Sequence, residues 1–382
     1  MAESTKRDLE KALIGFEPYP ECENPYCWGD GYIELSDEDG PDLPPYSIFL
    51  AFVVFSNFPH AGRDEKIAWS IPVLFRGVPF VLTYLKFGLR IYPLSPAGNP
   101  DVTPELLGRL KRIVHIVDKL VQPFADEQVT QGNVTFANRH SLFRHMYTFL
   151  REKAEAAYTA PPPPSEPILR DGQVVGWHSR PMQPEWEGFF FAAPTLDAYF
   201  SLLEHTLVLL LPFTEFQIGR DNIVHFITSS WAAKFKRVFD VAVNVEAQNI
   251  FHALNTLRRS LRNPLSHGGA DEDAQHVLYF HFKGVGALPL SLSRHKHSIH
   301  FSIVPIPSKS FTQVCETLDS VDRFLRDGPL ALAMRYVEAG LDVAFDAKTL
   351  QEYRTAMESE ASMNEFIEAT EWVVDQADNM DW

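Results

Sequence analysis

Hydrophobic residues follow two different periods along this chain of 382 residues, and the change of period predicts its elements. Between residues 46 and 95, runs rich in Ile, Val, Phe and Tyr are separated by "SNFPHAG", "RGVP" and "KFG", a pattern typical of three or four strands. From 104 to 124 the spacing becomes helical, with Thr103 expected as N-cap and Pro104 as first helical residue. A second helix is expected over 140–158. Residues 1–158 are therefore predicted to form a mixed, β-rich α/β domain.

The segment "TAPPPPSEP" at 159–167 cannot continue a helix, because proline lacks the backbone donor and clashes with the preceding turn. A run of this composition favours an extended, semi-rigid spacer. The next residues alternate around Asp171–Gly172, a pair typical of a two-residue hairpin turn. Residues 159–192 are thus predicted to be a linker and a hairpin.

Helical periodicity dominates the last part of the chain, 193–382, which is predicted to be a mainly helical bundle. The predicted helices cover 194–213, 222–240, 246–262, 308–327, 329–340 and 347–377, and two short strands are expected at 277–282 and 299–307. The predicted fold class is α+β, with the β-rich domain preceding the helical one.

Composition and charge narrow the class of protein. Hydrophobic residues make up 45% of the chain and include 29 Phe, enough for packed cores. The apolar runs are either too short to span a bilayer or broken by charges, no secretory signal fits the amino terminus, and the chain has only three cysteines. These features predict a cytoplasmic protein without a membrane segment. The net charge of −16 disfavours non-specific coating of nucleic acid.

One region departs from that acidity. Residues 231–300 hold nine Lys or Arg and five Asp or Glu, a net charge of +4. They include "LRRSLRNPLSHGG" at 257–269, in which an amphipathic helix ends at Arg262 and a proline follows Asn263. Five residues of unbroken helix would leave Arg262 and His267 about 140° apart, and a kink at the proline brings them towards one side.

Other candidate sites are weaker, and each has an ordinary structural explanation. Arg220 and His225 repeat the same spacing, but a neighbouring Asp221 or Asn222 is a natural N-cap. Cys22 and Cys27 form half of a zinc site that no second cysteine pair completes. The remaining pairs are His295 with His297, interpreted as exposed strand residues, and Glu204 with His205, interpreted as a satisfied polar pair at the edge of the bundle. No metal or cofactor is predicted.

The segment "RNPLSH", placed at the end of a helix that follows two long helices, resembles the R-φ-x3-H motif of the HEPN superfamily (higher eukaryotes and prokaryotes nucleotide-binding). The resemblance covers roughly 194–330 and extends to "VLYFHFKGVGALPLSL", which is similar to uncharacterised bacterial members. It implies a helical bundle that dimerises and brings two motifs into one cleft, where single-stranded RNA is cut without metal.

The resemblance also implies roles for three residues. His267 would handle the proton of the attacking 2′-hydroxyl or of the leaving oxygen, Arg262 would hold the scissile phosphate, and Asn263 would orient the site. These types suit the chemistry, because histidine titrates near neutral pH and arginine offers a fixed fork of donors to phosphate. The neighbouring bases expected to contact RNA are Lys234, Lys236, Arg237, Arg258 and Arg259.

The sequence thus leaves two hypotheses. The first is a homodimeric endoribonuclease of a toxin or phage-defence system, whose amino-terminal domain senses a protein or small-molecule trigger. The second is a non-catalytic, dimeric binding or scaffold module, in which Asn263, His267 and the glycines only terminate a helix.

Overall fold

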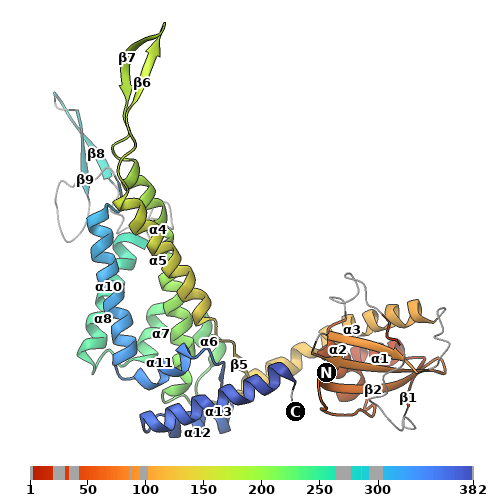
Figure 1. Ribbon diagram of the computed structural model, residues 1–382. Helices are drawn as coiled ribbons and strands as arrows, with labels where there is room; N and C mark the ends of the chain where they lie inside the picture. Colours follow the sequence, from red (N-terminus) through yellow and green to blue (C-terminus); the bar gives the residue numbers. More distant parts are fainter. Residues whose placement is uncertain are drawn as a thin grey trace. The chain divides into compact units, whose positions relative to one another are not determined.

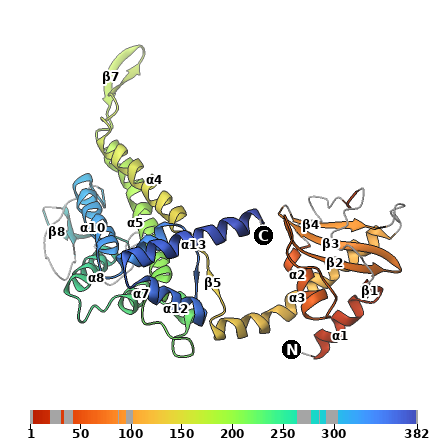
Figure 2. The same ribbon diagram turned by 60° about the horizontal axis from the view of Figure 1, so that its bottom comes forward.

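The computed structural model divides the chain into two compact units, residues 1–131 together with 368–382, and residues 132–367. It describes residues 3–19, 31–33, 43–86, 88–94, 102–262, 277–284, 286–291 and 304–380. The first unit contains an antiparallel sheet with helices, and the second is mainly helical (Figures 1 and 2). The predicted α+β class is confirmed.

The first unit is built on a four-stranded antiparallel sheet with the strands in sequence order. Its elements are α1 Glu3–Ala12, β1 Phe16–Pro18, α2 Pro45–Phe49, η1 Leu50–Val54, β2 Ile67–Phe75, β3 Val78–Leu85, β4 Gly88–Pro93 and α3 Thr103–Gln131. The tight β2–β3 turn has positive φ at Arg76 and Gly77, of 50° and 76°. Consecutive strands joined by short turns account for the alternating apolar runs of the sequence.

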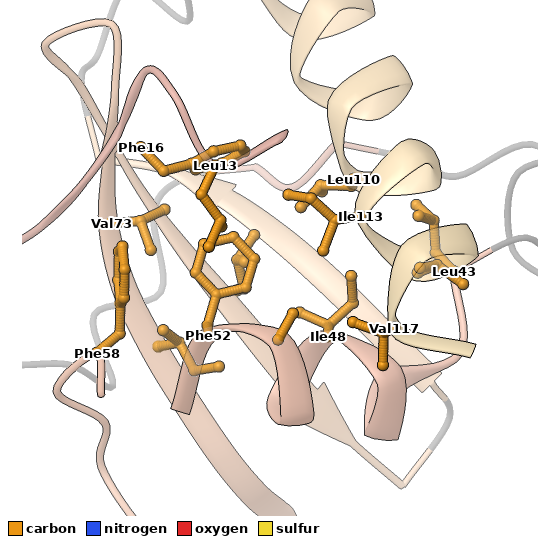
Figure 3. Close-up of a cluster of buried hydrophobic side chains, with 14 of the residues drawn as sticks. Leu13, Phe16, Leu43, Ile48, Phe52, Phe58, Val73, Leu110, Ile113 and Val117 are labelled. Atoms are coloured by element: carbon orange, nitrogen blue, oxygen red, sulfur yellow. The ribbon is translucent and has the colours of Figure 1, made fainter. Parts of the chain in front are cut away.

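The core of this unit lies between one face of the sheet and its helices (Figure 3). Val73 of β2 and Phe16 of β1 meet Phe52, while Ile113 comes from α3. The segment 47–55 was expected among the strands but forms α2 and η1. Its buried residues Ile48, Ala51 and Phe52 fall on one helical face, and burial of that face against the sheet outweighs the β-propensity of its composition.

The second unit begins after α3 and contains a helical bundle with short two-stranded sheets. Its helices are α4 His140–Thr159, α5 Gln183–Leu210, η2 Leu211–Phe213, α6 Ile223–Thr228, α7 Trp231–Val238, α8 Val245–Leu257, η3 Arg258–Arg262, α10 Ser308–Asp327, α11 Ala331–Glu338, α12 Ala347–Ala356 and α13 Glu360–Asn379. Its strands are β5 Thr135–Phe136, β6 Glu166–Arg170, β7 Gln173–His178, β8 Val277–Phe282, β9 Gly286–Ser291 and β10 Val343–Ala344. The residues of α13 from 368 onward belong to the first unit.

The boundary between the units lies at Gln131, before α4, whereas the sequence predicted a boundary at the proline-rich segment that follows α4. Helix α4 belongs to the second unit because its inner face packs along α5, with the Tyr147 and Tyr199 rings 5.0 Å apart. Arg144 and Arg151 on the same helix form bidentate pairs with Asp322 and Asp319 of α10. The prolines at 161–164 connect α4 to the β6–β7 hairpin within this unit.

The predicted β6–β7 hairpin is confirmed, with Asp171 and Gly172 both at positive φ in its turn. The predicted extent of linker and hairpin, 159–192, is too long, because α5 begins at Gln183 and carries Pro194 in its interior. Proline there removes one helical hydrogen bond, and the next residue, Thr195, donates its hydroxyl to the Phe191 carbonyl at 2.7 Å. Packing of this buried helix thus overrides the proline signal.

Three further elements differ from their prediction. The helix expected over 222–240 is two helices, because Ser229 and Ser230 are extended and Ser230 caps α7. The helix expected over 347–377 breaks between α12 and α13. The partner of β8 is β9, whereas the sequence placed a strand at 299–307; residues 304–307 form no strand, and 299–303 lie outside the described residues.

Helix α5 continues through η2 to form an apolar segment, Gln183–Phe213, long enough by length and composition to cross a membrane. Of its most apolar stretch, 78% is buried inside the protein. A core helix of a folded domain meets the same criterion, and here α5 supplies the centre of the second unit's core. It is the one such helix among the described residues.

Two histidines near the start of α4 lie in this core. The ring of His205 accepts a hydrogen bond from the Arg139 amide at 2.8 Å and contacts the Phe136 and Phe143 rings. His140 is 5% exposed, and its Nε2 has no hydrogen-bond partner within the described residues. Burial lowers the pKa of each imidazole to about 4, because a charged ring would lose its water.

These histidines should make the second unit less stable in acid. The unfolded state binds protons near pH 6.5 and the folded state only near pH 4, so stability decreases as the pH falls through that interval. After allowance for screening at the half-buried His205, we expect a loss of roughly 2–3 kcal/mol for the pair. Urea unfolding of the full chain at pH 7.5 and 4.5 measures this loss.

The matched variants are His140→Gln/His205→Gln, which removes both titrations, and His225→Gln, which changes an exposed histidine. The double variant should lose most of the acid dependence and the control should retain it. If both keep the wild-type profile, other groups cause the acid sensitivity.

Candidate functional site

Arg262 is the one residue of the predicted catalytic set whose position is described. It ends η3, a turn of π-helix that continues α8 after Leu257. The helix begins where the Asn244 side chain caps it by accepting from the Ala247 amide at 2.9 Å. Its buried residues Ile250, Leu254 and Leu257 face the bundle, as the sequence pattern predicted.

Two residues of α5 hold the Arg262 side chain. Its Nε donates to Asp197 Oδ1 at 2.8 Å, and its guanidinium carbon lies 5.2 Å from the centre of the Phe200 ring. Asp197 and Phe200 are three residues apart and therefore share a face of the helix. The Arg262 side chain is 28% exposed, and its terminal amino groups form no hydrogen bond with any described residue.

This arrangement has a chemical consequence. The carboxylate and the aromatic ring restrict the guanidinium, while the two terminal nitrogens carry donors that are bonded to no residue in the described part of the chain. A planar fork of N–H donors matches the oxygens of a phosphate. Sequence reasoning missed Asp197 and Phe200, and their spacing alone is no signal, because Glu187 and Phe190 repeat it on the same helix.

Asn263 and His267 lie outside the described residues, as do Cys22, Cys27, His295 and His297. Their predicted roles therefore stay predictions. Among the residues that are described, no group of three or more His, Cys, Asp or Glu could hold a metal ion.

The five expected RNA-contacting bases fall into two groups. Lys236 is exposed and lies over the Phe251 ring, at 4.9 Å from its centre. Arg259 is exposed on η3 beside the half-buried Arg258, whose Nε is buried without a hydrogen-bond partner among the described residues. Arg258 and Arg259 therefore lie on the same turn as Arg262, and Lys236 lies on α7 against α8.

The other two bases have structural partners. Lys234 is 5% exposed and its ammonium lies 2.8 Å from Glu204 Oε2, so its prediction as an RNA contact is corrected: a buried amine cannot reach a phosphate backbone. Arg237 donates to Asp221 Oδ2 at 3.1 Å and also to Thr214 and the Glu215 carbonyl. Both cations are thus engaged within the folded bundle, where loss of either partner would leave a poorly solvated charge unpaired.

The second R-x4-H pair, Arg220 and His225, has the structural role that the sequence favoured. Asn222 caps α6 by accepting from the His225 amide at 2.9 Å. The Gln217 amide and Arg237 lower the pKa of the Asp221 carboxyl, despite its partial burial, by stabilising the charged form. A cavity of about 250 Å³ lies beside these residues, and Asp221, Asn222 and His225 are part of its lining.

Glu204 and His205 are also satisfied, as predicted, although with separate partners: Glu204 pairs with Lys234, and His205 accepts from the Arg139 amide. Among the described residues, neither side chain forms a hydrogen bond or an ion pair with Arg262. The candidate site is therefore limited to Arg262, its two supporting residues on α5 and the nearby bases.

Comparisons with protein-family models, with curated proteins and with solved structures find no match to this chain. The candidate site must therefore be judged by its own geometry.

Proposed function

We propose that the second unit is a metal-independent endoribonuclease of the HEPN type, which cuts single-stranded RNA by attack of a 2′-hydroxyl on the adjacent phosphorus. The observation that carries this proposal is the Arg262 guanidinium, which Asp197 and Phe200 hold and whose terminal donors bond no described residue, five residues before His267. A restrained arginine followed by a histidine supplies the two elements that this reaction needs.

In the proposed reaction, a base takes the proton of the 2′-hydroxyl while the new bond to phosphorus forms. The bond to the 5′-oxygen breaks, and an acid protonates that leaving oxygen. His267 serves in one of these proton transfers, and Asn263 orients the site. Arg262 donates to the non-bridging oxygens, whose negative charge increases in the transition state. The products are a 2′,3′-cyclic phosphate and a 5′-hydroxyl.

Surrounding residues support binding of an anionic strand despite the net charge of −16. Arg258 and Arg259 lie on η3, the turn that ends at Arg262, and Lys236 lies on α7 over the Phe251 ring of α8. We further propose that the enzyme acts as a homodimer in the cytoplasm, in a toxin or phage-defence system, with a trigger sensed by the first unit.

The test is incubation of the purified full chain with 5′-labelled single-stranded RNA, followed by end-group analysis. We expect fragments ending in a 2′,3′-cyclic phosphate, equal cleavage with excess EDTA, and no cleavage where the nucleotide 5′ to the scissile bond is 2′-deoxy. A folded chain that binds RNA or protein without cutting RNA supports instead the non-catalytic binding or scaffold module. Cleavage that EDTA abolishes, or products with a 5′-phosphate, contradicts the proposed reaction.

A further inference from the structure

The β6–β7 hairpin extends from the end of the α4–α5 pair (Figure 1). All five residues of β6 are exposed, as are all those of β7 except the half-exposed Gly176. A two-stranded hairpin on its own is at best marginally stable in water. We call residues 166–178 the arm, and its exposure raises the question of what covers it.

The strand register gives the arm one apolar face. Pro167 pairs with Trp177, and Leu169 pairs with Val174, so these four side chains share a side of the ribbon. Leu169, Val174 and Trp177 are 62%, 53% and 64% exposed. The opposite side carries mostly polar residues, Glu166, Arg170, Gln173 and His178, with Ile168 lying over Gly176.

Both edges of the arm are protected against strand addition. In β6, Pro167 has no amide hydrogen to donate. In β7, the register shift between Ile168 and Leu169 leaves Val175 as an extra, bulged residue. The face, and not an edge, is therefore the surface suited to association.

A groove adjoins the base of the arm, where the chain enters α5. It encloses about 500 Å³ and is lined by Ser179, Arg180, Pro181, Met182, Gln183, Trp186, Glu187 and Phe190. Trp186 and Phe190 are 37% and 61% exposed. The Oε1 atom of Gln183 is buried and has no donor among the described residues. The groove thus adds two exposed aromatic rings, Trp186 and Phe190, near the base of the arm.

The amount of exposed apolar surface matches half of a protein dimer. At about 150–250 Å² for a whole aromatic side chain and less for an aliphatic one, the exposed fractions of the arm and groove sum to roughly 600 Å². Patches of this size are at the upper limit for monomers, and a stable interface buries about 800 Å² on each partner, part of it polar.

The charges of the arm favour a second copy over other occupants. The arm and the groove lining carry Glu166, Asp171 and Glu187 against Arg170 and Arg180, a net charge of −1, and Arg180 already pairs with Glu166 at 3.1 Å. RNA or an anionic membrane would require a positive surface, which this region lacks. An apolar face with so small a net charge can instead pack against its own copy across a two-fold axis with little like-charge repulsion.

We propose that the apolar face of the arm, with the groove at its base, is a dimer interface that packs against the same face of a second copy. The proposal deepens the homodimer that the proposed function assumes, and it requires no nuclease activity. In the dimer, Trp177 and Leu169 leave water by contact with the partner's arm and groove.

The test is the mass of the full chain in solution, by sedimentation velocity over a range of concentrations. Wild type should be dimeric at micromolar concentration, and Leu169→Glu/Trp177→Glu should raise the dimer Kd by roughly 100-fold or more. Because the arm is exposed along its length, the variant should keep the wild-type circular dichroism and melting profile. The matched control is Gln173→Glu, a charge on the polar face, which should leave the dimer intact.

Cross-linking between two chains provides a second, independent test of the arm as the dimer interface. Val174→Cys should form a disulfide between two chains under mild oxidation, at a rate that the Leu169→Glu substitution suppresses. A monomeric wild type, or a dimer that withstands Leu169→Glu/Trp177→Glu, overturns the proposal. The proposal is also overturned if Leu169→Glu/Trp177→Glu has the same mass in solution as the wild type but loses a binding to neutral phospholipid vesicles or to RNA that the wild type shows. A dimer formed through the arm without RNA cleavage contradicts only the proposed function, and cleavage by a dimer formed elsewhere contradicts only this interface.

Discussion

His267→Ala is expected to reduce the rate of RNA cleavage by about 10²–10⁴-fold, because a side chain that transfers a proton in the transition state contributes on that scale. Arg262→Ala should reduce it by roughly 10²–10³-fold, through loss of the donors that stabilise charge on the phosphate. Arg262→Lys should recover little of this, since lysine retains the charge but lacks the planar fork that Asp197 and Phe200 position. Single-turnover cleavage rates measure each effect.

The chain provides a matched control for spacing. Arg220→Ala/His225→Ala changes the second R-x4-H pair, which lies at the Asn222 cap of α6, and should leave the cleavage rate unchanged. The melting profile of His267→Ala separates chemistry from folding. A variant that melts as wild type but does not cut RNA supports catalysis by His267, whereas a lower melting temperature with unchanged cleavage indicates a helix-terminating role.

The second large effect concerns the ion pair between Glu204 of α5 and Lys234 of α7. Glu204→Ala leaves an ammonium group that is only 6% exposed without its carboxylate, and loss of one partner from a buried pair costs about 3 kcal/mol. The expected result is local destabilisation of α7 against α5. Hydrogen exchange of the α7 amides should accelerate by roughly 100-fold, which is the same free energy expressed as a rate.

Two further variants test the cause. Glu204→Gln/Lys234→Met removes both charges and should restore most of the protection, because no unpaired charge then remains buried. Lys348→Ala removes an exposed i,i+4 pair with Glu352, whose partners are 86% and 42% exposed, and should change stability by less than about 0.5 kcal/mol. If Glu204→Ala exchanges as slowly as Lys348→Ala, the pair contributes nothing to the bundle.

Turn residues and hydrophobic spacing in the sequence correctly predicted the elements whose conformation depends on a few neighbouring residues. Asp171–Gly172 specifies the hairpin because both residues tolerate positive φ, and the spacing of Ile250, Leu254 and Leu257 specifies the buried face of α8. Helices α4 and α10 also begin and end near their predicted limits, 140–158 and 308–327. Elements with conflicting signals were wrong: Pro194 was interpreted as the start of a helix that in fact begins at Gln183.

In the candidate site, too, features that depend on neighbouring residues could be predicted, and features that depend on packing could not. The sequence placed Arg262 at the end of its helix and a cap of the next helix at Asp221 or Asn222, because both features depend on a few neighbouring residues. It could not distinguish Lys236, which is exposed beside Phe251, from Lys234, which is buried against Glu204. The two lysines are two positions apart on one short helix and therefore lie on different faces, and the identity of the buried face depends on what packs against it.

By itself, the sequence determined the fold class, the hairpin and the amphipathic helix that ends at Arg262, because turn chemistry and hydrophobic period act over a few residues. Only the tertiary structure decided that α4 belongs to the second unit, that Asp197 and Phe200 hold Arg262, and that the arm presents one apolar face. These features join residues that are between 5 positions (Leu169 and Val174) and 178 positions (Arg144 and Asp322) apart in the chain. Packing and register set such contacts, and no local pattern encodes them.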